Sequence, residues 1–160
     1  MGLAEELDGC QSFSDIFEVV KKSVSQTLGR HRAGLTLYLA ELPTNVGAFY
    51  PVGSNAIVMN KALLKVVDES PRSQRVKASF VYSILLHEYL HSLGYLSEGE
   101  ARRLALHIAR ESLGDEHAAT RMCLTGPWSF FPEAMSKVGS FGGEFEIVKD
   151  FDKAPRGYLA

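Results

Sequence analysis

The sequence predicts a single domain of the α+β class, with a small mixed β-sheet, over residues 1–160. Three observations predict this class. Apolar residues recur at helical spacing in several stretches, runs rich in aromatic and branched residues lie between two of these stretches, and no repeat or linker divides the chain. A length of 160 residues is also typical of one domain, since single domains commonly hold roughly 100 to 200 residues.

The first part of the chain predicts a helix followed by strands. Residues 13–28 carry apolar side chains at spacings of three and four, which line one face of a helix, and Gly29 is a typical helix stop. Residues 34–42 and 47–60 are rich in aromatic and branched side chains and are interrupted by proline, glycine and asparagine. They predict strands joined by turns.

The rest of the chain predicts mainly helices. Residues 62–70 predict a short helix, and residues 73–93 predict a longer one that ends at a glycine. A further helix is expected to begin at Ser97, because a glutamate three residues later completes a capping box before the next apolar run. The aromatic and glycine-rich C-terminal stretch predicts one short strand at residues 144–148.

Composition limits the classes of function. The net charge of −2 gives no broad attraction for nucleic acid or for anionic lipid. No stretch approaches the roughly 20 apolar residues of a membrane span, and the acidic amino terminus lacks the apolar core of a signal peptide. Cys10 and Cys123 lie far apart in the sequence, which fits a reducing compartment. We therefore expect a cytoplasmic protein that binds neither nucleic acid nor membrane.

The sequence HEYLH, residues 87–91, closes the long predicted helix. His87 and His91 are four residues apart and share one helix face, so both imidazoles can hold a single tetrahedral zinc ion. Glu88 lies about 100° around the helix from His87, where it can reach a water on the metal without becoming a ligand. The apolar stretch before the motif predicts that both histidines lie near the core.

A catalytic zinc ion needs a third protein ligand and one open position. Glu98 falls in the first turn of the next helix, and a short turn after Gly94 can bring it beside the histidines. His117, from a third helix, is the alternative third ligand. For the donor that stabilises an oxyanion, the sequence offers Tyr95, His117 and Arg121 and does not rank them.

The residues HEYLH, Gly94 and the following Glu98-x-x-Ala101-Arg102 resemble the zincin metallopeptidases, and among them the small gluzincins called minigluzincins. The resemblance covers about residues 45–110. It implies a zincin-like domain in which an active-site helix is followed by a glutamate-bearing helix.

The resemblance also implies roles for particular residues. His87, His91 and Glu98 would bind zinc, and Glu88 would be the general base and acid. The stretch NAIVMN, residues 55–60, is similar to the edge strand that runs along the cleft of zincins and pairs with an extended peptide.

We therefore expect a zinc-dependent metallopeptidase that acts on peptide or protein substrates. Zinc lowers the pKa of a bound water to about 7, and Glu88 would take its proton and pass it to the leaving amine. Two alternatives remain open: a zinc-binding interaction protein without activity, and a zinc hydrolase with a non-peptide substrate such as RNA. For RNA, a local basic patch could come from Arg102, Arg103, Arg110 and Arg121.

One further hypothesis is that the tail, residues 150–160, enters the cleft and keeps the enzyme latent.

Overall fold

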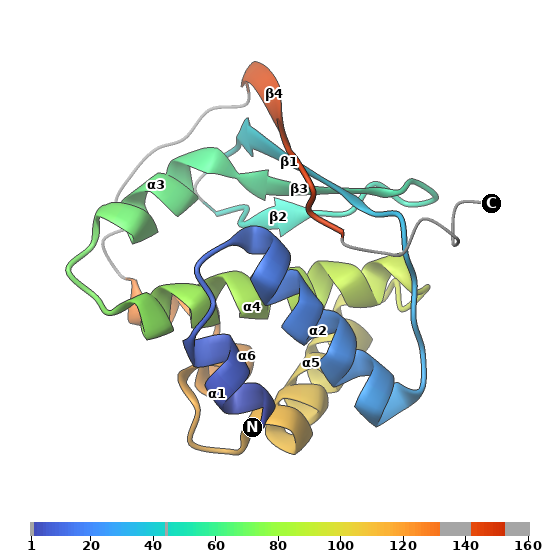
Figure 1. Ribbon diagram of the computed structural model, residues 1–160. Helices are drawn as coiled ribbons and strands as arrows, with labels where there is room; N and C mark the ends of the chain where they lie inside the picture. Colours follow the sequence, from blue (N-terminus) through green and yellow to red (C-terminus); the bar gives the residue numbers. More distant parts are fainter. Residues whose placement is uncertain (1, 44, 132–141, 153–160) are drawn as a thin grey trace.

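Figure 1 shows the computed structural model, which describes residues 2–43, 45–131 and 142–152. These residues form six α-helices and one four-stranded mixed sheet. The helices are α1 (Leu3–Asp8), α2 (Phe13–Leu28), α3 (Lys61–Glu69), α4 (Gln74–Ser92), α5 (Glu98–Leu113) and α6 (Ala118–Thr125), followed by the 3-10 helix η1 (Pro127–Phe130). The strands are β1 (Thr36–Glu41), β2 (Ala48–Phe49), β3 (Ala56–Asn60) and β4 (Gly142–Val148). The predicted α+β class is confirmed.

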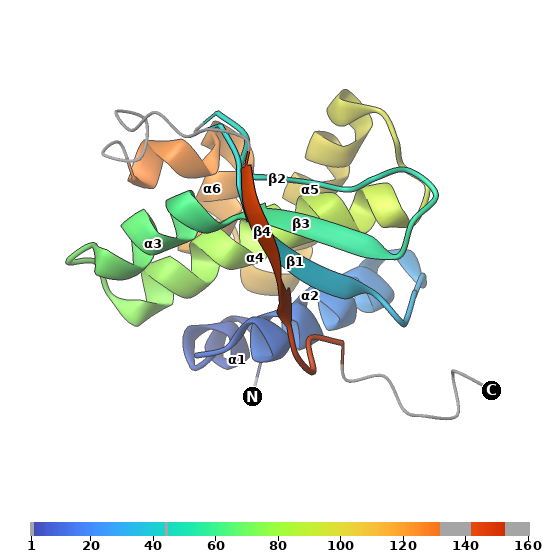
Figure 2. The same cartoon turned by 90° about the horizontal axis from the view of Figure 1, so that it is seen from above.

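The sheet has the strand order β2-β3-β1-β4. β1 pairs in parallel with β3, whereas β4 and β2 pair antiparallel with β1 and β3 respectively. Seen from above, β3 and β1 lie side by side over α4, and β2 lies on the side of α5 (Figure 2). β2 is therefore the edge of the sheet on that side.

The prediction that residues 55–60 form the edge strand is wrong. These residues include β3, which lies between β2 and β1. In β3, Ile57, Val58, Met59 and Asn60 are all buried, as expected for a strand covered on both faces and paired on both sides. β2 covers the side that was expected to be free, and at two residues it is too short to show an alternating pattern.

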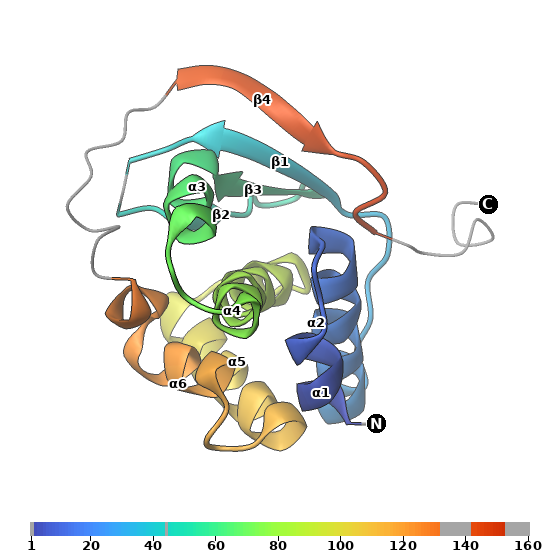
Figure 3. The same cartoon turned by 60° about the vertical axis from the view of Figure 1, so that its left-hand side comes forward.

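The long helix α4 is the centre of the fold. In Figure 3 it is seen nearly end-on, with the sheet above it, α1 and α2 on one side and α5 and α6 on the other. Of its 19 residues, 14 are buried, which is typical of a helix that is surrounded by other elements. Its C-terminal turns therefore carry the histidines of HEYLH into a region walled by the sheet and by other helices.

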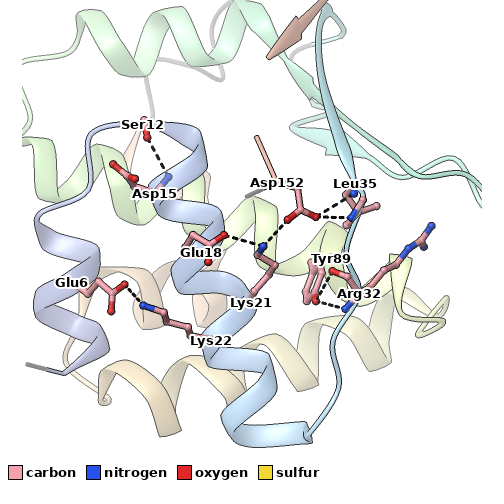
Figure 4. Close-up of polar contacts among 11 residues, drawn as sticks. Glu6, Ser12, Asp15, Glu18, Lys21, Lys22, Arg32, Leu35, Tyr89 and Asp152 are labelled. Atoms are coloured by element: carbon pink, nitrogen blue, oxygen red, sulfur yellow. Dashed lines mark hydrogen bonds and ion pairs between the residues drawn. The ribbon is translucent and has the colours of Figure 1, made fainter. Parts of the chain in front are cut away.

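An ion-pair network attaches the residues after β4 to the rest of the domain (Figure 4). Asp152 accepts hydrogen bonds from Lys21 Nζ at 2.6 Å and from the backbone N–H groups of Gly34 and Leu35 at 2.9 and 3.2 Å. The Phe151 ring stacks on Phe17, with 4.2 Å between the ring centroids. Burial lowers the pKa of Lys21, but its bonds to the neighbouring carboxylates outweigh burial and raise the pKa above the ordinary value.

These contacts bear on the hypothesis that residues 150–160 enter the cleft. Phe151 and Asp152 bind α2 and the segment before β1. Residues 153–160 lie outside the described residues. A truncation that tests the latency hypothesis should therefore begin after Asp152, because removing residues 150–152 would also remove these structural contacts.

Replacing Asp152 with asparagine is expected to lower the free energy of unfolding by roughly 2 to 3 kcal/mol, because Lys21 loses a charged partner in a buried environment. Glu18 Oε1 stays 2.9 Å from Lys21 Nζ, so part of the pairing survives. Urea unfolding followed by circular dichroism measures the difference. Asp150→Asn is the matched control, since Asp150 is exposed. Equal unfolding midpoints for the two variants would contradict the role of Asp152.

Candidate metal centre

The last two turns of α4 bring His87 and His91 together. Their Nε2 atoms lie 3.1 Å apart, as the four-residue spacing predicts for one helix face. His91 is buried, with 8% of its surface exposed, and His87 is partly buried. Burial is the largest cause that lowers the pKa of His87, and the positive charge of Arg102 adds to it, although Glu98 acts in the opposite direction.

Gly94 reverses the chain directly after α4. Its φ of +105° is strained for residues with a side chain, so the reversal itself requires glycine. Ser97 then begins α5, since its hydroxyl accepts a hydrogen bond from the backbone N–H of Glu100. This short connection returns the first residue of α5, Glu98, to the two histidines.

The Glu98 carboxylate faces both imidazoles. Its Oε1 lies 2.7 Å from His91 Nε2, and its Oε2 lies 3.1 Å from His87 Nε2. Burial is the largest single influence on Glu98 and opposes its ionisation, but attraction to His87 and hydrogen bonds to both histidines together outweigh it and lower the pKa of the carboxyl group. Within the described part of the chain, these three side chains form the group of potential metal ligands.

The tautomer of His91 is fixed by the backbone. Its Nδ1 lies 2.7 Å from the carbonyl oxygen of Tyr95. A carbonyl oxygen only accepts hydrogen bonds, so Nδ1 carries a hydrogen and donates it. In the neutral ring, the lone pair is then on Nε2 and points to His87 and Glu98. Metal-binding histidines commonly donate their other ring N–H to a carbonyl in this way.

The donor set fits zinc in kind and in spacing. Two imidazole nitrogens and one carboxylate oxygen are common zinc ligands, and two ligands about 2.1 Å from one tetrahedral zinc ion lie about 3.4 Å apart. The corresponding distances among His87, His91 and Glu98 range from 2.7 to 3.3 Å. The lone pair of neutral His91 Nε2 and the Glu98 carboxylate lie 2.7 Å apart, so this pair needs a proton or a cation between the two atoms.

Glu88 lies beside this group without joining it. Its side chain lines the same cleft as both histidines and is buried, with 6% of the residue exposed. Burial is the main cause that raises the pKa of Glu88 to about 7. A carboxyl group with this pKa can both accept and release a proton near neutral pH.

The buried state of Glu88 predicts a pH-dependent effect on stability in metal-free protein. The pKa of Glu88 rises from 4.5 to about 7 on folding, so its ionisation destabilises the fold as the pH rises from about 4.5 to above 7. Glu88→Gln is therefore expected to gain roughly 2 to 3 kcal/mol over wild type between pH 5 and pH 8. Urea unfolding in the presence of a chelator measures this gain. Glu100→Gln, an exposed control on α5, should show none, and a gain of equal size in both variants would contradict the burial argument.

The metal group lies in the wall of a cleft of about 690 Å³. Its lining comes from β2 and its flanks, from α4, from α5 and the turn before it, and from the end of α6 and η1. The lining residues are 45–50 and Val52, then Ser83, Ile84, His87, Glu88 and His91, then Leu96, Glu98, Arg102 and Ala105, and finally 122–128. The histidines and Glu88 therefore line a cleft that is large enough for a small ligand.

Two arginines from the connection between α2 and β1 hold the end of α4. The guanidinium of Arg32 donates to the carbonyl oxygens of Ser92 and Ser54 at 2.7 and 2.8 Å. Its backbone N–H donates to the Tyr89 hydroxyl at 2.8 Å, a contact drawn in Figure 4. Arg30 donates to the carbonyl oxygen of Leu93 at 2.9 Å. Sequence reasoning missed this role, because the partners of both arginines at the end of α4 lie about 60 residues away in the sequence.

His117, the alternative third ligand, lies elsewhere. It is the N-cap of α6, where its Nδ1 accepts a hydrogen bond from Ala119 N at 3.0 Å. Its Nε2 is 2.8 Å from Asp8 Oδ1, so both ring nitrogens have partners. The structure thus brings Glu98, and not His117, to the histidines.

The three candidates for an oxyanion donor do not line the cleft. His117 is paired with Asp8, and Arg121 pairs with Glu116 at 2.7 Å. The Tyr95 ring lies under the Arg30 guanidinium, 5.2 Å from ring centroid to Cζ, while its carbonyl binds His91. Of the other histidines, His31 and His107 are exposed and lie outside the ligand group.

Comparisons of this chain with protein-family models, with curated proteins and with solved structures give no match. In the described part of the chain, every helix is too short or too polar to cross a lipid bilayer.

Proposed function

We propose that the protein is a zinc-dependent metallopeptidase in which His87, His91 and Glu98 hold the metal and Glu88 is the general base and acid. The observation that supports this most strongly is the meeting of two Nε2 atoms and one carboxylate at distances of 2.7 to 3.3 Å. The same cleft holds a buried carboxyl group that is not one of these ligands.

The chemistry assigned to each side chain follows from its surroundings. Zinc, when bound, supplies a Lewis acid that polarises a peptide carbonyl and lowers the pKa of water to about 7. Glu88 accepts a proton from the attacking water and then donates it to the leaving nitrogen, so that one amide bond is replaced by a carboxylic acid and an amine. The Tyr95 carbonyl keeps His91 in the tautomer that presents Nε2 to the metal.

The position of β2 favours a peptide as the substrate. β2 is an edge strand whose residues line the cleft, and an edge strand has unpaired backbone groups that can pair with an extended chain. A peptide bound along β2 would cross the cleft opposite His87 and Glu88. In this proposal Ala48 and Phe49, and not residues 55–60, form the edge strand that pairs with the substrate.

A purely structural zinc site is less well supported. Structural zinc sites have four protein ligands, whereas catalytic sites have three and an open position. The described residues supply three ligands, and the group borders a cleft. An RNA substrate also has less support, because of the four arginines considered only Arg102 lines the cleft.

The proposal is tested by cleavage of fluorescein-labelled casein with zinc-loaded protein, with protein treated with 1,10-phenanthroline, and with treated protein after zinc is restored. We expect cleavage to be lost with the chelator and recovered with zinc. Identifying the products by mass spectrometry distinguishes this protein from a contaminating protease, since Glu88→Gln purified in the same way should form these products at least about 100-fold more slowly. Cleavage that is unaffected by the chelator, or absent in zinc-loaded protein, would contradict the proposal.

A further inference from the structure

Arg102 is the one lysine or arginine among the described residues that line the cleft. It lies four residues after Glu98 on α5, so the two side chains leave the helix on the same face, about 6 Å apart along its axis. Ala105, one turn further on, continues this lining face of α5. The other charged groups of the cleft are the proposed metal ligands and Glu88.

The Arg102 guanidinium has no ion pair or hydrogen bond within the described residues, although it is exposed to the cleft. Glu98 does not pair with it, because the Glu98 carboxylate faces His87 and His91. By contrast, Arg110 pairs with Asp115 and Arg121 pairs with Glu116. Arg102 therefore differs from these arginines, because its cation lies at the cleft and has no carboxylate partner among the described residues.

The surroundings of Arg102 favour an anionic ligand with apolar neighbours. Apart from the charged groups named above, the described cleft lining is uncharged, and it includes Val52, Leu96 and Leu124, which are 73%, 53% and 59% exposed. A guanidinium binds a carboxylate through two parallel hydrogen bonds. An extended peptide advances about 3.3 to 3.6 Å per residue, so a separation of about 6 Å along the helix corresponds to about two residues.

We propose that Arg102 binds a carboxylate of the substrate and makes the enzyme prefer peptides with such a group within about two residues of the cleaved bond. The inference rests on the proposed peptidase function. Two sources supply the same chemistry: the free C-terminus of a peptide and the side chain of an internal aspartate or glutamate.

The test measures binding in the Glu88→Gln background, so that it does not depend on turnover. The probes are four fluorescein-labelled peptides based on the sequence Ala-Leu-Phe-Leu-Ala. The first two end in a free carboxylate or in an amide, and the other two are amidated and carry glutamate or glutamine at the fourth position. Fluorescence anisotropy gives the dissociation constants for zinc-loaded protein with Arg102, Arg102→Gln or Arg102→Lys. Arg103→Gln is the matched control, because Arg103 is exposed on the same helix but does not line the cleft.

With Arg102 present, the carboxylate member of at least one pair is expected to bind roughly 10-fold more tightly than its neutral partner. The pair that shows the difference identifies the source of the carboxylate. Arg102→Gln should abolish the preference, Arg102→Lys should keep part of it, and Arg103→Gln should keep all of it. If the carboxylate bound only to zinc, the carboxylate peptide would still bind more tightly than its neutral partner in Arg102→Gln.

The inference is overturned by equal binding within both pairs, by a preference that survives Arg102→Gln, or by no binding of any of the four peptides. Thermal unfolding of each variant checks that the fold is unchanged. Cleavage of the amidated peptides by the zinc-loaded wild type tests the peptidase function separately. Cleavage without a carboxylate preference would support the peptidase function and contradict the role of Arg102. A carboxylate preference without cleavage would support binding of a carboxylate by Arg102 and contradict the peptidase function.

Discussion

Glu88→Gln is expected to lower kcat for peptide cleavage by at least about 100-fold, the lower end of the usual contribution of a general acid or base. Glutamine has nearly the shape of glutamate and fits the same buried position, but it cannot accept a proton from water. Steady-state cleavage of a quenched fluorescent peptide measures kcat for the wild type and the variant.

The zinc content of Glu88→Gln is expected to equal that of wild type, because Glu88 does not belong to the group of potential ligands. This separates a role in proton transfer from a role in metal binding. Glu100→Gln, exposed near the start of α5, is the control for a change of one charge nearby and should keep wild-type kcat. A kcat for Glu88→Gln that stays near the wild-type value would refute Glu88 as the base.

His91→Ala and Glu98→Ala are each expected to weaken zinc binding by more than about 100-fold, which exceeds the usual effect of losing an outer hydrogen-bond partner of a ligand. Either change leaves two protein ligands, fewer than the three that catalytic zinc sites use. Competition with a chromophoric chelator gives the affinity, and the loss of activity should follow the loss of zinc.

Two further histidine variants make the assignment of the ligands specific. His107→Ala removes an exposed imidazole on α5 and should leave the zinc affinity unchanged. His117→Ala should also keep the affinity, although loss of its bonds to Asp8 and Ala119 is expected to lower the unfolding temperature. If His117→Ala lost zinc while Glu98→Ala kept it, the third ligand would have been assigned to the wrong residue.

The helices that carry the metal group could be predicted well from the sequence. The bounds of α2, Phe13–Leu28, are those predicted. α4 begins and ends close to its expected limits, and α5 begins where expected, because apolar periodicity and capping residues mark these positions. α1 was missed, since six residues are too few for periodicity to appear. β2 lies within residues 47–60, for which strands joined by turns were predicted, but at two residues it shows no pattern that would mark it as the edge of the sheet.

The candidate site was predictable only in part. The spacing within HEYLH is enough to bring His87 and His91 together, because both lie on one helix. The return of Glu98 to the histidines depends on the turn at Gly94. The left-handed conformation of this residue could be predicted because it is a glycine, but the direction in which the chain leaves the turn could not be predicted from the sequence. The contacts of Arg32 and the position of Arg102 in the cleft depend on packing between distant segments, which local patterns do not encode.

The most direct test is a crystal structure of protein supplied with one equivalent of zinc, with anomalous data collected at the zinc absorption edge. The account predicts one anomalous peak about 2.0 to 2.2 Å from His87 Nε2, from His91 Nε2 and from a carboxylate oxygen of Glu98. No peak between these three side chains, or a peak bound by other residues, would contradict it.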